Sequence, residues 1–181
     1  MENLNLYKKY YFLEDYLFQE ITNNFNKNHY LTDEEFFSII IWKSNRAKGW
    51  IVKGIKKELK EGRTIKDITE KIYEINDNKN RIIYLDKIYG IGIPIASAIL
   101  TVCYPNDFTI SDYRAQNSVR KIGYKGKDIT LSIRGYFEYL DFCKKLSKEN
   151  NLSLRDLDRC LFAKDFKRDL DILIKEVNNS G

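Results

Sequence analysis

The chain has 181 residues, of which 43% are hydrophobic, with only 2 prolines and 9 glycines and a formal net charge of +5. This length and composition are typical of one well-cored domain, or of two small lobes, built from long regular elements. No apolar run reaches the roughly 18–20 residues that span a bilayer, and the N-terminus lacks the basic-then-apolar layout of a secretory signal. We therefore expect an intracellular, cytoplasmic protein without a membrane partner.

Every element predicted along the chain is a helix, because apolar residues recur at spacings of three and four and no period-2 strand is evident. Thr32 or Asp33 is the expected N-cap of a buried helix that runs into Trp42–Arg46, and Gly62 is the expected stop after the helix predicted at 50–60. The other helices are expected at 5–22, 50–60, 64–75, 81–89, 94–104, 112–122, 130–147, 153–163 and 165–177, with polar loops at 23–29 and 76–80. The predicted fold is all-α, a two-lobed helical bundle forming a single compact domain, with lobes at 31–122 and at 1–30 plus 123–181.

Positive charge is concentrated in two segments. Residues 43–71 carry ten basic and four acidic side chains, and residues 111–134 carry six basic and two acidic, whereas residues 1–37 carry three basic and seven acidic. Two basic segments on an otherwise balanced chain indicate a polyanionic partner. For the first segment alone, a solvated lysine-rich face is an equal alternative.

The sulfur and imidazole groups are too few for a structural metal centre. Cys103, Cys143 and Cys160 are far apart in the sequence, and His29 is the only histidine. This ligand count excludes a structural zinc site and a four-cysteine iron–sulfur cluster. We expect the cysteines to be buried thiols and His29 to have no chemical role.

A helical hairpin with a glycine turn is predicted at about 81–104. Residues 85–100 read Leu-Asp-Lys-Ile-Tyr-Gly-Ile-Gly-Ile-Pro-Ile-Ala-Ser-Ala-Ile-Leu. Gly90 and Gly92 can adopt positive φ and bring the backbone close to a ligand, and Pro94 suits the first turn of a helix. The amides at the start of that helix would point outward, where the helix dipole favours an anion. The pattern predicts a phosphate-binding turn that reads no base sequence; an ordinary tight turn is the alternative.

The hairpin, followed by Phe108-Thr-Ile-Ser-Asp-Tyr-Arg114, resembles the helix-hairpin-helix DNA glycosylase superfamily, which includes endonuclease III and the 8-oxoguanine glycosylases. In that family a catalytic aspartate opens the next helix about twenty residues after the second glycine of the hairpin. Asp112 lies twenty residues after Gly92. The resemblance covers residues 85–123 well and residues 31–60 weakly.

The chain departs from the family in three places. Members that cut the strand carry a nucleophilic lysine two residues after the second glycine, where this chain has Pro94. The iron–sulfur loop of some members is missing, and Tyr113 and Arg114 replace the small residue and the histidine common after the aspartate. The resemblance therefore implies a monofunctional glycosylase, without AP-lyase activity, that hydrolyses the N-glycosidic bond of a modified base.

The resemblance also implies roles for other residues. Asp112 would stabilise the developing oxocarbenium cation and orient a water, although a plain N-cap is its alternative role. Trp42 and Tyr113 would serve as wedge or base pocket for an extruded nucleotide. A place in the core is an equal alternative for Trp42 and is the expectation for Trp50. DNA contacts are expected from Lys43, Ser44, Asn45, Arg46, Lys87, Gly90, Ile91, Gly92, Arg114, Arg120 and Lys121.

The expected partner is double-stranded DNA containing a modified base, bound by a nucleoid-associated monomer. No metal or cofactor is expected, except that a monovalent cation bound at the hairpin in the DNA complex stays open. Two other classes remain as alternatives: a non-catalytic DNA-binding module, and a protein-interaction domain whose hairpin has lost DNA. The identity of the excised base, and a role in repair or in defence against modified phage DNA, stay open.

Overall fold

The computed structural model describes residues 3–130 and 132–179. No strand occurs within these two ranges, and the predicted all-α class is confirmed. The chain divides into two units, Met1–Phe108 and Thr109–Gly181. No helix in the described part of the chain is both long and apolar enough to cross a membrane.

The N-terminal segment is helical but interrupted, where one continuous helix was predicted. It contains a short 3-10 turn η1 (Leu4–Tyr7), α1 (Lys8–Tyr11), α2 (Leu13–Asp15), the π-helical η2 (Tyr16–Ile21) and α3 (Thr22–Asn28). The break lies at Phe12, whose φ of −91° and ψ of 48° leave the helical region. The predicted loop at 23–29 is wrong, because α3 continues to Asn28 with Phe25 buried and ends at His29 in the left-handed conformation.

Hydroxyl caps set the starts of two of the next three helices, α4 (Asp33–Ser44), α5 (Lys48–Lys60) and α6 (Ile65–Glu74). Thr32 is the N-cap of α4, and its amide donates to the Glu35 carboxylate at 2.8 Å in a capping box. Thr64 forms the same motif at the start of α6. Gly62, with φ +81°, follows the end of α5 as predicted.

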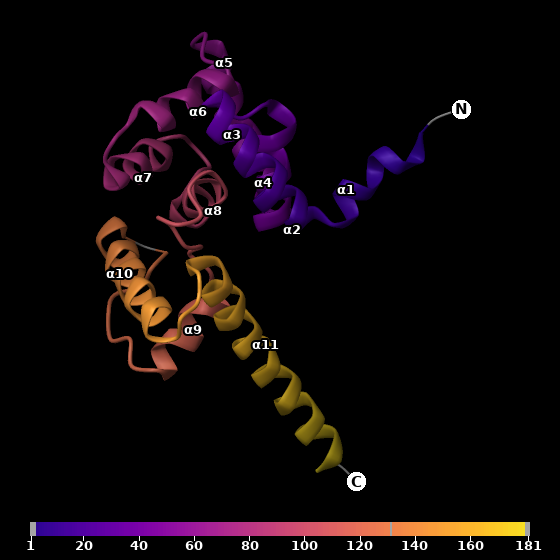
Figure 1. Cartoon of the computed structure of the whole chain (residues 1–181), viewed down its shortest axis with the longest axis vertical. Helices are drawn as coiled ribbons and strands as arrows, with labels where there is room; N and C mark the ends of the chain where they lie inside the picture. The colour runs from indigo at the N-terminus through magenta and orange to yellow at the C-terminus, as the bar shows by residue number, and fades with distance from the viewer. Residues whose placement is uncertain (1–2, 131, 180–181) are drawn as a thin grey trace. The chain divides into compact units, whose positions relative to one another are not determined.

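The core of the first unit forms around α8 (Ile93–Cys103), which contacts α3, α4, η2 and α7 (Asn78–Asp86) (Figure 1). All residues of α8 except Pro94 are buried. A hydrogen bond ties the N-terminal segment to this core, because the Thr22 hydroxyl donates to the Val102 carbonyl at 2.7 Å. The helix α7 begins earlier than predicted, because Asp77 caps its N-terminus within the expected loop at 76–80.

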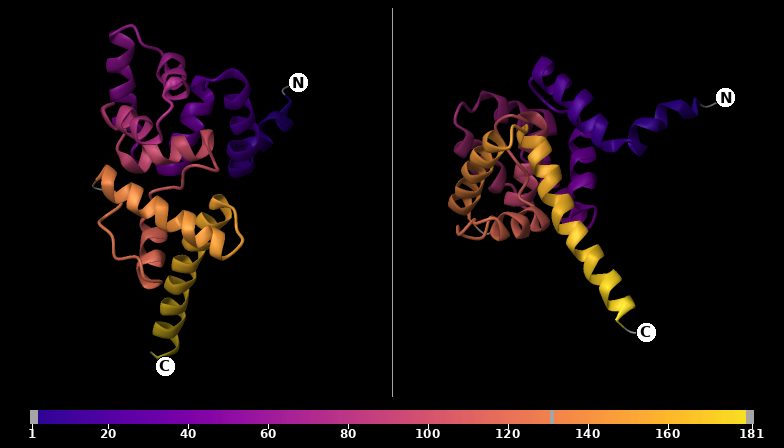
Figure 2. Two further views of the ribbon diagram at one scale, coloured as in Figure 1. Left: turned by 60° about the vertical axis from the view of Figure 1, so that its left-hand side comes forward. Right: turned by 60° about the horizontal axis from the view of Figure 1, so that its bottom comes forward.

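The second unit consists of α9 (Tyr113–Lys121), α10 (Ile133–Glu149) and α11 (Leu154–Asn178). The helix α9 packs against α11, and the buried Tyr136 hydroxyl of α10 donates to the Thr109 carbonyl at 2.8 Å. The prediction of two helices at 153–163 and 165–177 is wrong, because α11 is continuous through Lys164. Both views of Figure 2 show α11 extending past α9 and α10.

The predicted lobe boundaries also need correction. Residues 1–30 group with the first unit, through the contacts of η2 and α3 with α8, and not with residues 123–181. The first unit ends at Phe108, so α9 belongs with α10 and α11.

Candidate nucleic-acid interface

The turn between α7 and α8 is a helical hairpin with short local hydrogen bonds. The amide of Ile88 donates to the Leu85 carbonyl at 3.0 Å, and the amide of Ile91 donates to the Ile88 carbonyl at 2.9 Å. Ile88 and Ile91 are buried, so the turn folds back onto the core. The apolar positions that defined the predicted hairpin are all buried: Leu85, Ile88, Ile91, Ile95, Ala96 and Ile99.

The two glycines of the hairpin have different conformations. Gly90 has φ +86°, in the left-handed region that favours glycine. Gly92 has φ −86° and ψ 177°, which any residue can adopt, so the expectation of positive φ is wrong for Gly92. A Cβ on Gly92 would meet only Pro94 Cδ, at 3.8 Å. The fold therefore has space for a side chain at this position, and the glycine leaves the backbone uncovered.

The start of α8 presents unoccupied backbone donors. Gly92 is the N-cap and has no side chain to bond the first turn, while its carbonyl accepts from Ile95 and Ala96. Within the described residues, no group accepts a hydrogen bond from the amide of Gly92 or Ile93. These donors lie at the positive end of a helix dipole, beside an exposed glycine. The arrangement suits a phosphate oxygen.

Close backbone contacts fix α5 against this turn. A Cβ on Gly90 would lie 2.7 Å from the Trp50 carbonyl oxygen, and a Cβ on Gly54 would lie 1.7 Å from the Tyr89 carbonyl oxygen. A glycine on each side thus permits an approach that side chains would prevent. The sequence reasoning gave no role to Gly54, although a glycine inside a predicted helix was the available signal.

The Trp42–Arg46 segment ends α4 and enters a turn at 45–47. The Trp42 ring packs edge-to-face on Phe18, with centroids 5.6 Å apart, and is half-buried. Lys43 and Ser44 are also half-buried, whereas Asn45 and Arg46 are exposed. The exposed end of this segment is therefore polar.

Trp50 was expected in the core, and this prediction is wrong. Its side chain is 57% exposed on α5, and the Lys53 ammonium lies 4.7 Å from the ring centroid. Lys87 and Tyr89, on the turn, are exposed as well. Sequence patterning missed Trp50 because an isolated tryptophan within a basic helix gives no periodic signal.

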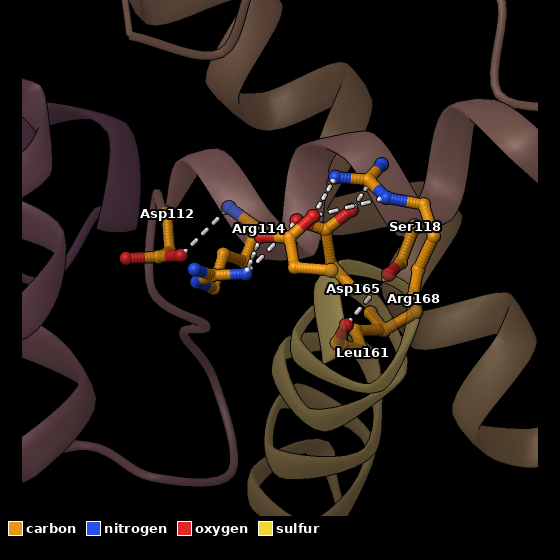
Figure 3. A network of polar contacts seen from close by, with 7 residues as sticks. Asp112, Arg114, Ser118, Leu161, Asp165 and Arg168 are labelled. Carbon is orange, nitrogen blue, oxygen red and sulfur yellow. Dashed lines mark hydrogen bonds and ion pairs between the residues drawn. The ribbon is translucent and has the colours of Figure 1, made fainter. Parts of the chain in front are cut away.

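Asp112, in the second unit, is the N-cap of α9. Its carboxylate accepts a hydrogen bond from the Arg114 amide at 2.9 Å, and the side chain is half-buried (Figure 3). A carboxylate at a helix N-terminus is stabilised by the dipole and by the first-turn amides. The N-cap role predicted for Asp112 is confirmed. Tyr113, which follows it, is 71% exposed.

Arg114 joins α9 to α11 through buried and exposed carboxylates. Its guanidinium pairs with Asp169 at 2.7 Å and with Asp165 at 3.4 Å, and Arg168 pairs with Asp165 at 2.6 Å (Figure 3). The Asp165 side chain is fully buried. Hydrogen bonds from Arg168 and then Arg114 hold the pKa of Asp169 below its ordinary value.

This network changes the interpretation of Arg114 as a DNA contact, because its charge is compensated within its own unit. The Ser118 hydroxyl adds a further link between the helices by donating to the Leu161 carbonyl at 2.6 Å. Arg120 and Lys121, the other basic residues expected to contact DNA from α9, are exposed. Arg114 therefore has a structural role that its position in the sequence did not reveal.

Comparison of the chain with protein-family models, with curated proteins and with solved structures gave no match. The resemblance to the glycosylase superfamily consequently rests on the residues of the hairpin and on Asp112. The described residues also contain no cluster of three or more side chains suited to hold a metal ion.

Proposed function

We propose that the chain binds the phosphodiester backbone of DNA through the hairpin between α7 and α8. The observation that carries this proposal is the bare backbone at Gly92, where the amides of Gly92 and Ile93 have no acceptor among the described residues. Amide donors at a helix N-terminus bind phosphate oxygens without reading the bases. Binding should therefore be insensitive to base sequence and should weaken as salt rises.

We further propose that the chain is a monofunctional DNA glycosylase with Asp112 as its catalytic carboxylate. Support comes from the twenty-residue spacing between Gly92 and Asp112 and from the position of Asp112 at the start of α9. As the N-glycosidic bond breaks, the carboxylate stabilises the oxocarbenium-like sugar and orients a water that attacks it. The products are a free modified base and an abasic site in an intact strand, since Pro94 occupies the position of the strand-cutting lysine.

A non-catalytic DNA-binding module is the second candidate. It is favoured by one observation: the N-cap hydrogen bond to the Arg114 amide gives Asp112 a sufficient structural role. The two candidates share the hairpin and differ only in turnover.

Replacing Asp112 separates the two candidates. Asparagine caps helices as well as aspartate does, so Asp112→Asn should keep the thermal unfolding temperature and DNA affinity of the native protein. A panel of duplexes, each with one modified base, would be incubated with each protein and scored for abasic sites after alkali treatment. We expect base release by the native protein on at least one duplex and loss of at least about a hundredfold in Asp112→Asn.

Equal base release by both proteins would remove Asp112 from the mechanism, and no release on any duplex would favour the binding module. Strand scission without alkali would contradict the role assigned to Pro94.

A further inference from the structure

One face of α5 carries a dense group of exposed lysines. Lys53, Lys56, Lys57 and Lys60, together with Tyr89 of the hairpin, line an open pocket of about 350 Å³. These five residues are called the lysine surface below. The sequence predicted DNA contacts at Lys43–Arg46, on the hairpin and at Arg114, Arg120 and Lys121. These lysines lie in the basic segment 43–71, but none of them was named as a contact.

The charge of the lysine surface is not compensated within the described part of the chain. The only carboxylate on α5 is Glu58, which is directed to Arg63 in an ion pair. No ion pair involves Lys53, Lys56, Lys57 or Lys60 among residues 3–130 and 132–179. Four uncompensated ammonium groups within two helical turns repel one another and favour a multivalent anion.

The aromatic rings beside these lysines favour the binding of a phosphate group by the lysines over the stacking of a DNA base on the rings. The Lys53 ammonium lies over the Trp50 ring at 4.7 Å, and the Lys57 ammonium lies over the Tyr89 ring at 4.4 Å. The two rings contact each other edge-to-face at 6.2 Å. Because an ammonium lies over one face of each ring, the rings position cations, and the face that each ammonium covers is not offered for base stacking.

The lysine surface is fixed to the hairpin. Gly54 lies against the Tyr89 carbonyl and Gly90 against the Trp50 carbonyl, so α5 cannot move independently of the turn that presents the Gly92 amide. The lysines and the bare backbone therefore belong to one rigid part of the first unit, in which Tyr89 of the hairpin lines the pocket with the lysines. From Lys53 to Lys60 the helix rises about 10 Å, which equals the rise along the duplex axis of about three phosphates of one strand.

We propose that the lysine surface is a second binding site for the phosphodiester backbone, which extends the hairpin contact along the same duplex. The proposal rests on the DNA-binding function proposed above and is independent of base excision. Each phosphate neutralised releases counterions and contributes about 0.9 to the dependence of log affinity on log salt concentration. Three such contacts amount to a slope contribution of about 2 to 3.

The test uses the full chain and an unmodified duplex, with affinity measured over a range of salt concentrations. Lys53, Lys56, Lys57 and Lys60 would be replaced together by glutamine. A matched control replaces four other exposed lysines by glutamine, at Lys27, Lys148, Lys164 and Lys175, so that the net charge of the two variants is the same. Unfolding temperatures of both variants would be compared with that of the native protein.

We expect the α5 variant to bind the duplex about ten- to a hundredfold more weakly near 0.15 M salt, with a slope smaller by about 2 to 3, and the control to change the slope by less than about 1. Equal slopes in the two variants would overturn the proposal, as would a duplex affinity of the α5 variant equal to that of the native protein. Gly92→Asp serves as the reference for the hairpin. If Gly92→Asp loses binding and the α5 variant does not, only this inference fails; if the native protein binds no duplex, the proposed function fails with it.

Discussion

At the scale of single residues, the two glycines of the hairpin differ: the backbone conformation and packing require glycine at position 90, whereas position 92 has space for a side chain. Gly90 combines φ +86° with a backbone contact to Trp50 that leaves no space for a Cβ. Gly92 has an ordinary extended conformation and open space around it. The bare backbone at Gly92 permits the close approach of a phosphate, and glycine is at the same time a favoured N-cap residue for α8.

This difference predicts unequal effects of two alanine variants. Gly90→Ala should lower the free energy of unfolding by at least about 1–2 kcal/mol, because a side chain is strained at positive φ. Gly92→Ala should lower it by less, up to about 1 kcal/mol, because alanine is a poorer N-cap than glycine but is not strained at this φ. Denaturant unfolding of the two variants measures both values. Equal destabilisation would show that Gly92 is also held by the fold.

At the scale of elements, α5 and the hairpin act as one body because the contact between them is made by backbone atoms. A Cβ at Gly54 would lie 1.7 Å from the Tyr89 carbonyl oxygen. This clash is with a backbone atom, so rotation of a side chain cannot remove it. Gly49, on the same helix, has no atom within 4 Å of its Cβ position and provides a control.

Gly54→Ala should therefore destabilise the protein by about 3 kcal/mol or more, because α5 must move away from the turn. Gly49→Ala should stabilise it by up to about 1 kcal/mol through helix propensity. Thermal unfolding compares the two variants. The packing described for α5 is contradicted if alanine has the same effect at both positions.

At the scale of the whole molecule, the ion-pair network between α9 and α11 gives stability a dependence on pH. The pKa of Asp169 is lowered by Arg168 and Arg114 in the folded chain, so Asp169 stabilises the fold above its unfolded pKa of about 4. This stabilisation is lost as the pH falls through the lower folded pKa.

We expect Asp169→Asn to unfold at a lower temperature than the native protein at pH 7, and this difference to shrink as the pH is lowered below about 4 toward pH 2. Asp141→Asn, on the exposed face of α10, is the control and should follow the native profile. Thermal unfolding over this pH range gives the three profiles. Parallel profiles for the native protein and Asp169→Asn would exclude Asp169 as a source of acid sensitivity.

Local patterns in the sequence predicted the helical class, the Thr32 cap, the stop at Gly62 and the buried face of the hairpin. These features depend on residues within one or two turns of each other. The features that were missed depend on distant partners. Asp165, at the predicted break in α11, lies inside a continuous helix where it pairs with Arg114 of α9.

The candidate interface shows the same limit. The turn glycines and Asp112 were identified from spacing, whereas Gly54 and the lysine surface depend on the packing of α5 against Tyr89, 35 residues away from Gly54 in the sequence. Trp50 was misplaced because an isolated tryptophan gives no periodic signal in the sequence, while its exposure follows from the packing of α5 against the turn.

The most direct test of the central claim is the affinity of the native protein and of Gly92→Asp for several unmodified duplexes of unrelated sequence. The added carboxylate would stand beside the amides proposed to bind a phosphate, and it has space in the free protein. We predict an unfolding temperature equal to or slightly above that of the native protein, because aspartate is a better N-cap than glycine. We also predict a loss of at least about tenfold in affinity that is equal for all duplexes. Unchanged affinity, or a loss restricted to particular sequences, would contradict DNA-backbone binding by the hairpin.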